Sequence, residues 1–121
     1  MLVSMLKSKL HNAVVTDCMI DYEGSIEIDS ALMKAVGMVH YEKVLVANLS
    51  NGNRFETYAI PGKKNSGTVS LNGAAALLGK KGDHVIILSF VLVPVKKSAR
   101  HQPSILLLGK NNKPAPQIKP H

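Results

Sequence analysis

The chain has 121 residues, of which 45% are hydrophobic, and it carries a formal net charge of +7. This length predicts one domain with a modest core, and no apolar run approaches the roughly 20 residues that a membrane span requires. The N-terminus has no charged leader followed by an apolar block and a cleavage site, so we expect no signal peptide. Cys18 is the only cysteine, which excludes an internal disulfide and indicates a cytoplasmic protein.

The positive charge is concentrated in residues 96–121. That segment has six Lys and Arg residues and no acid, whereas residues 1–95 have nine basic and eight acidic residues. The segment also contains four of the six prolines, so we expect a domain over residues 1–95 followed by a basic, largely mobile tail. A nucleic-acid-binding module would place aromatic residues among the basic ones. Residues 96–121 contain no Phe, Tyr or Trp, and we therefore expect no nucleic-acid partner.

Short strands dominate the first half of the chain. Residues 1–6 and 12–18 are rich in Val and other apolar residues, which predicts two strands. Residues 25–28 alternate polar and apolar side chains, as a half-buried strand does. Asp29 is a suitable N-cap for a short helix over residues 30–36, which Gly37 would end in a left-handed conformation.

The second half of the chain repeats this pattern. Residues 43–49 and 54–60 are predicted strands, and Asn51-Gly52 between them indicates a hairpin, because both residues tolerate positive φ. Further strands are predicted over residues 68–71, 84–93 and 104–108, with a short helix over residues 74–78. This pattern predicts a mainly β protein, a small closed barrel with two short helices.

Three segments carry a resemblance to a known family: Tyr22-Glu-Gly-Ser25, Arg54-Phe-Glu-Thr-Tyr58 and Asn72-Gly-Ala-Ala-Ala76. Shorter matches occur at residues 5–11, 51–54 and 89–91. From Met1 to about Pro94 the chain resembles the pyruvoyl-dependent aspartate 1-decarboxylases, bacterial lyases that make β-alanine for pantothenate biosynthesis. The resemblance implies a double-psi β-barrel and a homotetramer with active sites between subunits.

The resemblance also implies autocatalytic cleavage between Gly24 and Ser25. The Ser25 hydroxyl would attack the Gly24 carbonyl to form an ester, and elimination would leave dehydroalanine at position 25. Hydrolysis would then release ammonia and leave a pyruvoyl group, so that a small chain (1–24) separates from a large chain (25–121). Gly24 suits this step because it has no Cβ and leaves its carbonyl open to attack.

The pyruvoyl group would provide the electron sink that a decarboxylase needs. The five His residues show no metal-ligand spacing, and no lysine context suggests pyridoxal phosphate. In the family's reaction, L-aspartate forms a Schiff base with the pyruvoyl group and loses its α-carboxylate as carbon dioxide. By resemblance, Tyr58 then returns a proton to the α-carbon. Arg54 and Lys9 would bind the two carboxylates of the substrate.

The remaining site residues follow from the same resemblance. Thr57 and Asn72 would stabilise the oxyanion during processing, and Thr57 would later contact the substrate. The N–H groups of Gly73, Ala74 and Ala75 at a helix start would bind an anionic group of the substrate. His11 and Tyr22 are further candidates near the site. Ala47 departs from the family, whose well-studied members carry a Trp there, and this changes one wall of the pocket.

One alternative is a protein that has the same β-barrel fold but no enzymatic activity. The chain would then be a non-catalytic, uncleaved protein resembling a zymogen, either arrested or awaiting a maturation factor. The intact mass discriminates between the two, because only a processed chain splits.

Overall fold

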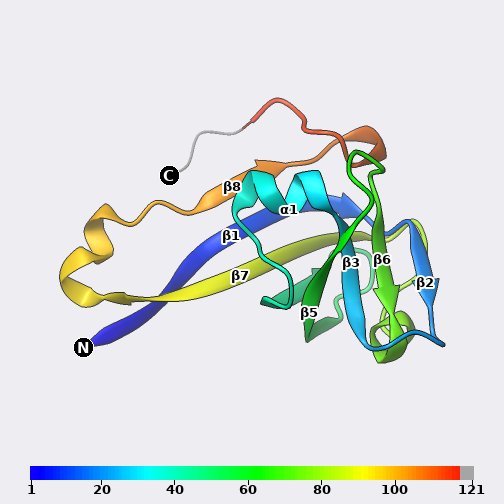
Figure 1. Ribbon diagram of the computed structural model, residues 1–121, viewed down its shortest axis with the longest axis horizontal. Helices are drawn as coiled ribbons and strands as arrows, with labels where there is room; N and C mark the ends of the chain where they lie inside the picture. The colour runs from blue at the N-terminus through cyan, green and yellow to red at the C-terminus, as the bar shows by residue number, and fades with distance from the viewer. Residues whose placement is uncertain (118–121) are drawn as a thin grey trace.

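The computed structural model describes residues 1–117 and is mainly β, as the sequence predicts (Figure 1). Its strands form one eight-stranded sheet in the order β2-β6-β3-β5-β4-β7-β1-β8, an arrangement consistent with the double-psi β-barrel. The strands are β1 (Leu2–Val14), β2 (Asp17–Met19), β3 (Ser25–Asp29), β4 (Lys43–Asn48), β5 (Arg54–Gly62), β6 (Val69–Asn72), β7 (His84–Pro94) and β8 (Ser104–Leu107). The helices are α1 (Ser30–Val36) and the 3₁₀ segments η1 (Gly73–Leu77), η2 (Val95–Arg100) and η3 (Lys110–Asn112).

Both short helices that the sequence predicts are present. The Asp29 side chain accepts a hydrogen bond from the Ala31 N–H at 2.9 Å and caps α1, and Gly37 ends α1 with φ 72°. The segment predicted over residues 74–78 forms η1. Asp29 also accepts hydrogen bonds from the N–H groups of Asn65 and Gly67, each at 2.9 Å. One buried carboxylate therefore fixes the start of α1 and the loop before β6.

The prediction of two separate strands over residues 1–6 and 12–18 is wrong, because β1 runs unbroken from Leu2 to Val14. Polar residues in the middle of β1 caused the error. Ser8 is fully buried, and its hydroxyl donates to the Val36 carbonyl, so a polar residue lies inside the strand without losing a hydrogen bond. Irregularities in the pairing with β7, together with Asn12 at φ 65°, bend the strand without ending it.

The hairpin predicted at Asn51-Gly52 is confirmed. Gly52 has φ 79°, and β4 pairs with β5 so that Lys43 lies opposite Tyr58 and Ala47 lies opposite Arg54. β5 also pairs in parallel with β3, with Ile26 opposite Ala59. The middle of β5 is thereby placed next to the start of β3.

The core consists of aliphatic side chains from every part of the sheet. Its largest fully buried members include Leu10, Ile26, Ile28, Leu71, Ile87 and Leu108. Leu108 lies beyond residue 95, in the segment that the sequence predicts to be a mobile tail. β8 confirms the strand predicted over residues 104–108, whereas the buried Asn112 shows that the ordered part of the chain extends beyond that strand.

The C-terminal segment packs on the barrel. β8 pairs in parallel with β1 and lies alongside it in Figure 1. The buried Asn112 side chain accepts from the Val14 N–H at 2.7 Å and donates to the carbonyls of Val14 and Gly67 at 2.9 and 2.8 Å. The Asn112 side chain thus bonds both the N–H and the carbonyl of Val14, as the backbone of a neighbouring strand would. The last four residues of the predicted tail, 118–121, lie outside the described part of the chain.

Candidate active site

A cleft of about 420 Å³ opens between the start of β3, the middle of β5 and the loop before β4. Four of the residues predicted from the sequence line it, and they come from three separate segments of the chain: Tyr22, Ser25, Tyr58 and Asn72. The cleft is completed by Glu23, Glu27, His40, Tyr41, Ile60 and Pro61. The structure therefore brings together the proposed nucleophile, the proposed proton donor and one oxyanion candidate.

Ser25 begins β3 and is only 2% exposed. Its hydroxyl donates to the Glu23 carbonyl at 3.2 Å and accepts a hydrogen bond from the Asn72 side-chain amide at 3.3 Å. The Ser70 hydroxyl in turn donates to the Asn72 side-chain oxygen at 2.9 Å. The Glu23 carbonyl can only accept, so the Ser25 hydroxyl uses its one proton in that bond. The Asn72 side chain must therefore present its N–H to Ser25 and its oxygen to Ser70. Ser70 is a member of the network that the sequence did not indicate.

Gly73 supports the segment that contains the Gly24–Ser25 bond. It has φ 64°, and a Cβ at this position would lie 2.6 Å from both the Cα and the N of Gly24. The same Cβ would lie 2.8 Å from the Tyr22 carbonyl oxygen. Only glycine allows the backbone to approach the bond this closely. Ala74 and Ala75 follow in η1, where Ala75 is buried and Ala74 is exposed.

Tyr58 lies next to an aromatic pair in the lining of the cleft. The Tyr41 ring centroid lies 5.8 Å from that of Tyr58, and the His40 ring stacks on Tyr41 with centroids 3.8 Å apart. No sequence motif marks His40 or Tyr41. The backbone of Tyr41 lies in the left-handed region at φ 71°, which is uncommon for a residue other than glycine.

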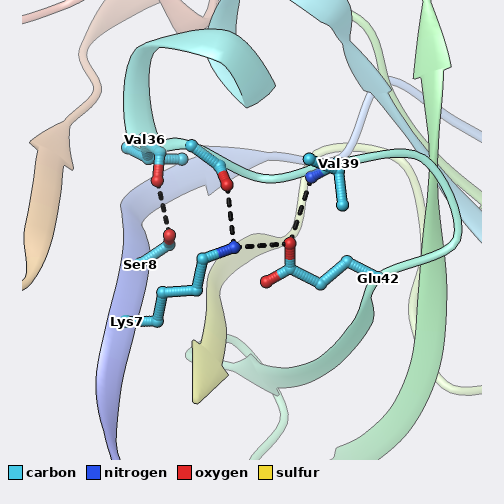
Figure 2. Close-up of polar contacts among 6 residues, drawn as sticks. Lys7, Ser8, Val36, Val39 and Glu42 are labelled. Carbon is cyan, nitrogen blue, oxygen red and sulfur yellow. Dashed lines mark hydrogen bonds and ion pairs between the residues drawn. The ribbon is translucent and has the colours of Figure 1, made fainter. Parts of the chain in front are cut away.

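The loop that carries His40 and Tyr41 is anchored on β1 (Figure 2). The Lys7 ammonium donates to the Gly37 carbonyl at 2.8 Å and to the Glu42 carboxylate at 2.7 Å, and the same carboxylate oxygen accepts from the Val39 N–H at 3.1 Å. Burial tends to raise the pKa of Glu42, but the bonds from Lys7 and Val39 outweigh it and hold the pKa below its usual value. The carboxylate is therefore charged at neutral pH.

Eight predicted residues do not line this cleft within one chain. Gly24 and Gly73 to Ala75 lie beside Ser25 and Asn72 in sequence, and the other four are Lys9, His11, Arg54 and Thr57. Thr57 directly precedes Tyr58 on β5, so its side chain points to the opposite face of the strand. Arg54 lies at the start of β5, opposite Ala47. The sequence signal for these residues came from their motifs, which carry no information on the direction in which a side chain points.

Lys9 and His11 lie on β1, which is separated from β3 by three intervening strands. Nδ1 of His11 is buried and has no hydrogen-bond partner. Burial and, to a smaller extent, the charge of Lys9 lower the pKa of His11. The imidazole is therefore neutral at neutral pH.

The following two statements apply to residues 1–117. None of the helices described there combines the length and the apolar character needed to cross a membrane. Within the same residues, no group of three or more His, Cys, Asp or Glu side chains is arranged to hold a metal ion.

Comparison with known proteins identifies the family. The sequence profile of the aspartate decarboxylase family matches residues 1–115, well beyond Pro94, where the recognisable motifs end. The chain is 50% identical over 113 residues to aspartate 1-decarboxylase from Caldicellulosiruptor saccharolyticus, covering 93% of this chain and 88% of the relative. It is 50% identical over 109 residues to the enzyme of that name from Dehalococcoides mccartyi, covering 90% and 88%. For the one from Leptospira biflexa the identity is 48% over 115 residues, covering 94% and 98%. The chain therefore belongs to the aspartate decarboxylase family.

Proposed function

We propose that the protein converts L-aspartate to β-alanine and carbon dioxide, using a pyruvoyl group that it makes from its own Ser25. The observation that carries this proposal is the cleft, in which Ser25, Asn72 and Tyr58 meet in a chain of the aspartate decarboxylase family. The β-alanine would serve pantothenate and coenzyme A biosynthesis. We place the reaction in the cytoplasm, where aspartate is available.

The residues around Ser25 support self-processing. The Ser25 hydroxyl is adjacent in sequence to the Gly24 carbonyl, and the position where Gly24 would carry a Cβ is open, with no atom within 4 Å. The Asn72 amide already donates to the Ser25 hydroxyl, and such a donor stabilises negative charge that develops on oxygen. Attack of Oγ on the Gly24 carbonyl carbon would transfer the acyl group from nitrogen to oxygen. Elimination and hydrolysis would then yield chains 1–24 and 25–121.

The cleft also suits a pyruvoyl group at position 25, because residue 25 lines a cavity that has room for a small substrate. When present, that group supplies the electron sink that accepts the electron pair released with carbon dioxide. The protein's own residues bind the substrate and move protons. We assign the return of a proton to the α-carbon to the Tyr58 hydroxyl, and the neighbouring ring of Tyr41 limits how far Tyr58 can move.

We further propose a homotetramer with active sites between subunits. The residues that line the cleft in the single chain include no Lys or Arg, yet the substrate carries two carboxylates. Lys9 and Arg54 of a neighbouring subunit would supply these charges. Thr57 and His11 of that subunit would complete the site, and the N–H groups at the start of η1, at Gly73, Ala74 and Ala75, would contact the substrate from the first subunit.

The alternative of an uncleaved, zymogen-like barrel makes a different mass prediction. Denaturing mass spectrometry of the purified protein should show residues 1–24 and a 97-residue chain that begins with pyruvoyl. Ser25→Ala should remain intact because it has no nucleophile. An intact wild-type chain that makes no β-alanine, even after incubation with a cell extract that could contain a maturation factor, would contradict the proposed function.

A further inference from the structure

The loop of residues 37–42 forms one wall of the cleft, and although Met38 is buried in the core, the two loop residues that line the cleft are not buried. It contributes His40 and Tyr41 to the lining, and both side chains are exposed, Tyr41 by 69%. The left-handed backbone of Tyr41, at φ 71°, is strained for a residue other than glycine and persists only where the surroundings enforce it. Contacts from outside the loop must therefore fix the place of Tyr41.

Besides the burial of Met38, two sets of polar contacts fix the loop. On one side β5 holds it, because the Tyr41 N–H donates to the Ala59 carbonyl at 2.8 Å and the Ala59 N–H donates to the Glu42 carbonyl at 2.9 Å. On the other side β1 holds it through Lys7, whose ammonium bridges the Gly37 carbonyl and the Glu42 carboxylate. Lys7 thus joins both ends of the loop, as Figure 2 shows.

The Lys7–Glu42 pair differs from an ordinary surface ion pair. Its side chains are 34% and 14% exposed, and each partner makes a second hydrogen bond to the loop backbone. The pair between Lys43 and Glu56 has a similar separation of 2.6 Å, but its side chains are 76% and 59% exposed. Exposed pairs contribute little to structure. The chain therefore contains its own matched control.

We propose that Lys7 and Glu42 are positioning residues for decarboxylation, which hold the 37–42 loop so that Tyr41 stays against Tyr58 and closes the cleft around the substrate. This inference rests on the proposed function. In this proposal Lys7 affects the reaction indirectly, through the position of Tyr41 in the cleft. Loosening the loop should weaken substrate binding and the placement of Tyr58. It should leave self-processing unchanged, because the hydrogen bonds that join Ser25, Asn72 and Ser70 involve no residue of the loop.

The kinetic test compares Lys7→Met, Lys7→Arg and the control Lys43→Met, each after its cleavage has been verified by mass. Lys7→Met should process normally but lose roughly three- to thirtyfold in kcat/KM for aspartate, the range typical of coupling between contacting groups. Lys7→Arg should recover most of this loss, since its guanidinium can donate to both acceptors. Lys43→Met should match the wild type. If Lys7→Met fails to fold, Glu42→Gln takes its place, because it keeps the oxygen for Val39 and loses only the charge.

A double-mutant cycle tests whether Lys7 acts through Tyr41. If it does, adding Lys7→Met to Tyr41→Ala should lower kcat/KM no further than Tyr41→Ala alone. Additive losses would overturn the proposal, and so would equal activities of Lys7→Met and Lys43→Met. Failure of Lys7→Met to cleave would also overturn it, since that result would assign Lys7 a general structural role.

A reporter in the loop gives a readout that needs no activity. The protein contains no Trp, and Val39 is 62% exposed, so Val39→Trp places a single fluorophore in the loop while its N–H still bonds Glu42. Adding Lys7→Met should lower the tryptophan anisotropy, and adding Lys43→Met should not. Unchanged anisotropy would overturn the inference about Lys7. A wild type that made no β-alanine would contradict the proposed function, and the anisotropy result would not depend on it.

Discussion

Gly73 is the residue at which a single methyl group should have the largest effect on self-processing. A Cβ there would overlap the Gly24 backbone at 2.6 Å, and the left-handed backbone adds about 1–2 kcal/mol for any residue other than glycine. Gly73→Ala should therefore displace the segment before Ser25 and slow cleavage, measured as the intact fraction by mass spectrometry over time.

Gly82→Ala is the matched control for Gly73→Ala. Gly82 has φ 94° but no atom within 4 Å of its virtual Cβ, so it shares the backbone penalty and lacks the overlap. Equal cleavage rates for the two variants would show that contact with Gly24 is unimportant.

Tyr58 separates the two reactions that we assign to the cleft. Tyr58→Phe keeps the ring and its contact with Tyr41, and removes only the hydroxyl. The variant should process normally, because cleavage requires Ser25 and the oxyanion donors. Its β-alanine production should fall by about 10²-fold or more, as the loss of a positioned acid usually causes. Tyr41→Phe distinguishes the two phenols, and a larger loss there than in Tyr58→Phe would reassign the proton donor.

At the scale of elements, one buried side chain joins the C-terminal segment to the barrel. Asn112→Ala leaves the Val14 N–H and the Gly67 carbonyl without these partners in a buried site. We expect the free energy of unfolding to fall by about 1–3 kcal/mol, measured by urea denaturation. Lys110→Ala, at an exposed position of the same 3₁₀ segment, should have little effect. Deleting residues 111–121 should destabilise at least as much as Asn112→Ala, although the composition of this segment suggests a dispensable tail.

The sequence predicts well those elements whose start or end is determined by neighbouring residues in the chain. The helix α1 follows from Asp29 and Gly37, and the hairpin follows from Asn51-Gly52, because each signal acts over a few residues. The unbroken course of β1 could not be predicted in this way. Its central polar residues remain in a strand because β7 and β8 pair with both of its edges, and β8 lies nearly 100 residues further along the chain.

The same distinction applies to the site. Ser25, Tyr58 and Asn72 stand in recognisable motifs, and the structure brings them into one cleft. Tyr41 was missed because its place depends on pairing between segments distant in sequence, in which β5 lies beside β3 and also holds the loop. Asn112 was missed for a similar reason, since its partners Val14 and Gly67 belong to distant segments.

For the whole molecule, two buried carboxylates predict loss of stability in acid. Hydrogen bonds from the Asn48 side chain and the Lys80 N–H lower the pKa of Asp83. Burial acts to raise the pKa of Asp29, but three backbone N–H groups outweigh it and lower the pKa. A lowered pKa in the folded state stabilises the protein above the unfolded value of about 4, and this contribution is lost as the pH falls through the folded pKa.

The midpoint of thermal unfolding should therefore decline below about pH 4. Asp83→Asn should be less stable than the wild type near neutral pH and should show a shallower decline in acid. The measurement is the unfolding temperature of both proteins between pH 3 and pH 7. Parallel curves over this range would show that Asp83 does not contribute to acid sensitivity.

The central position of β1 has a consequence for how the protein can be made. β1 lies between β7 and β8, yet after the proposed cleavage it belongs to a separate peptide of 24 residues. The precursor folds as one molecule, whereas the mature protein, once denatured, can recover only by an encounter between two. Formation of the barrel in the mature protein should therefore slow on dilution, whereas formation of the barrel within a Ser25→Ala subunit, before any assembly into tetramers, should not. The mature protein therefore keeps a fold that formed before cleavage, and the lifetime of this fold depends on the rate of unfolding rather than on reversible refolding.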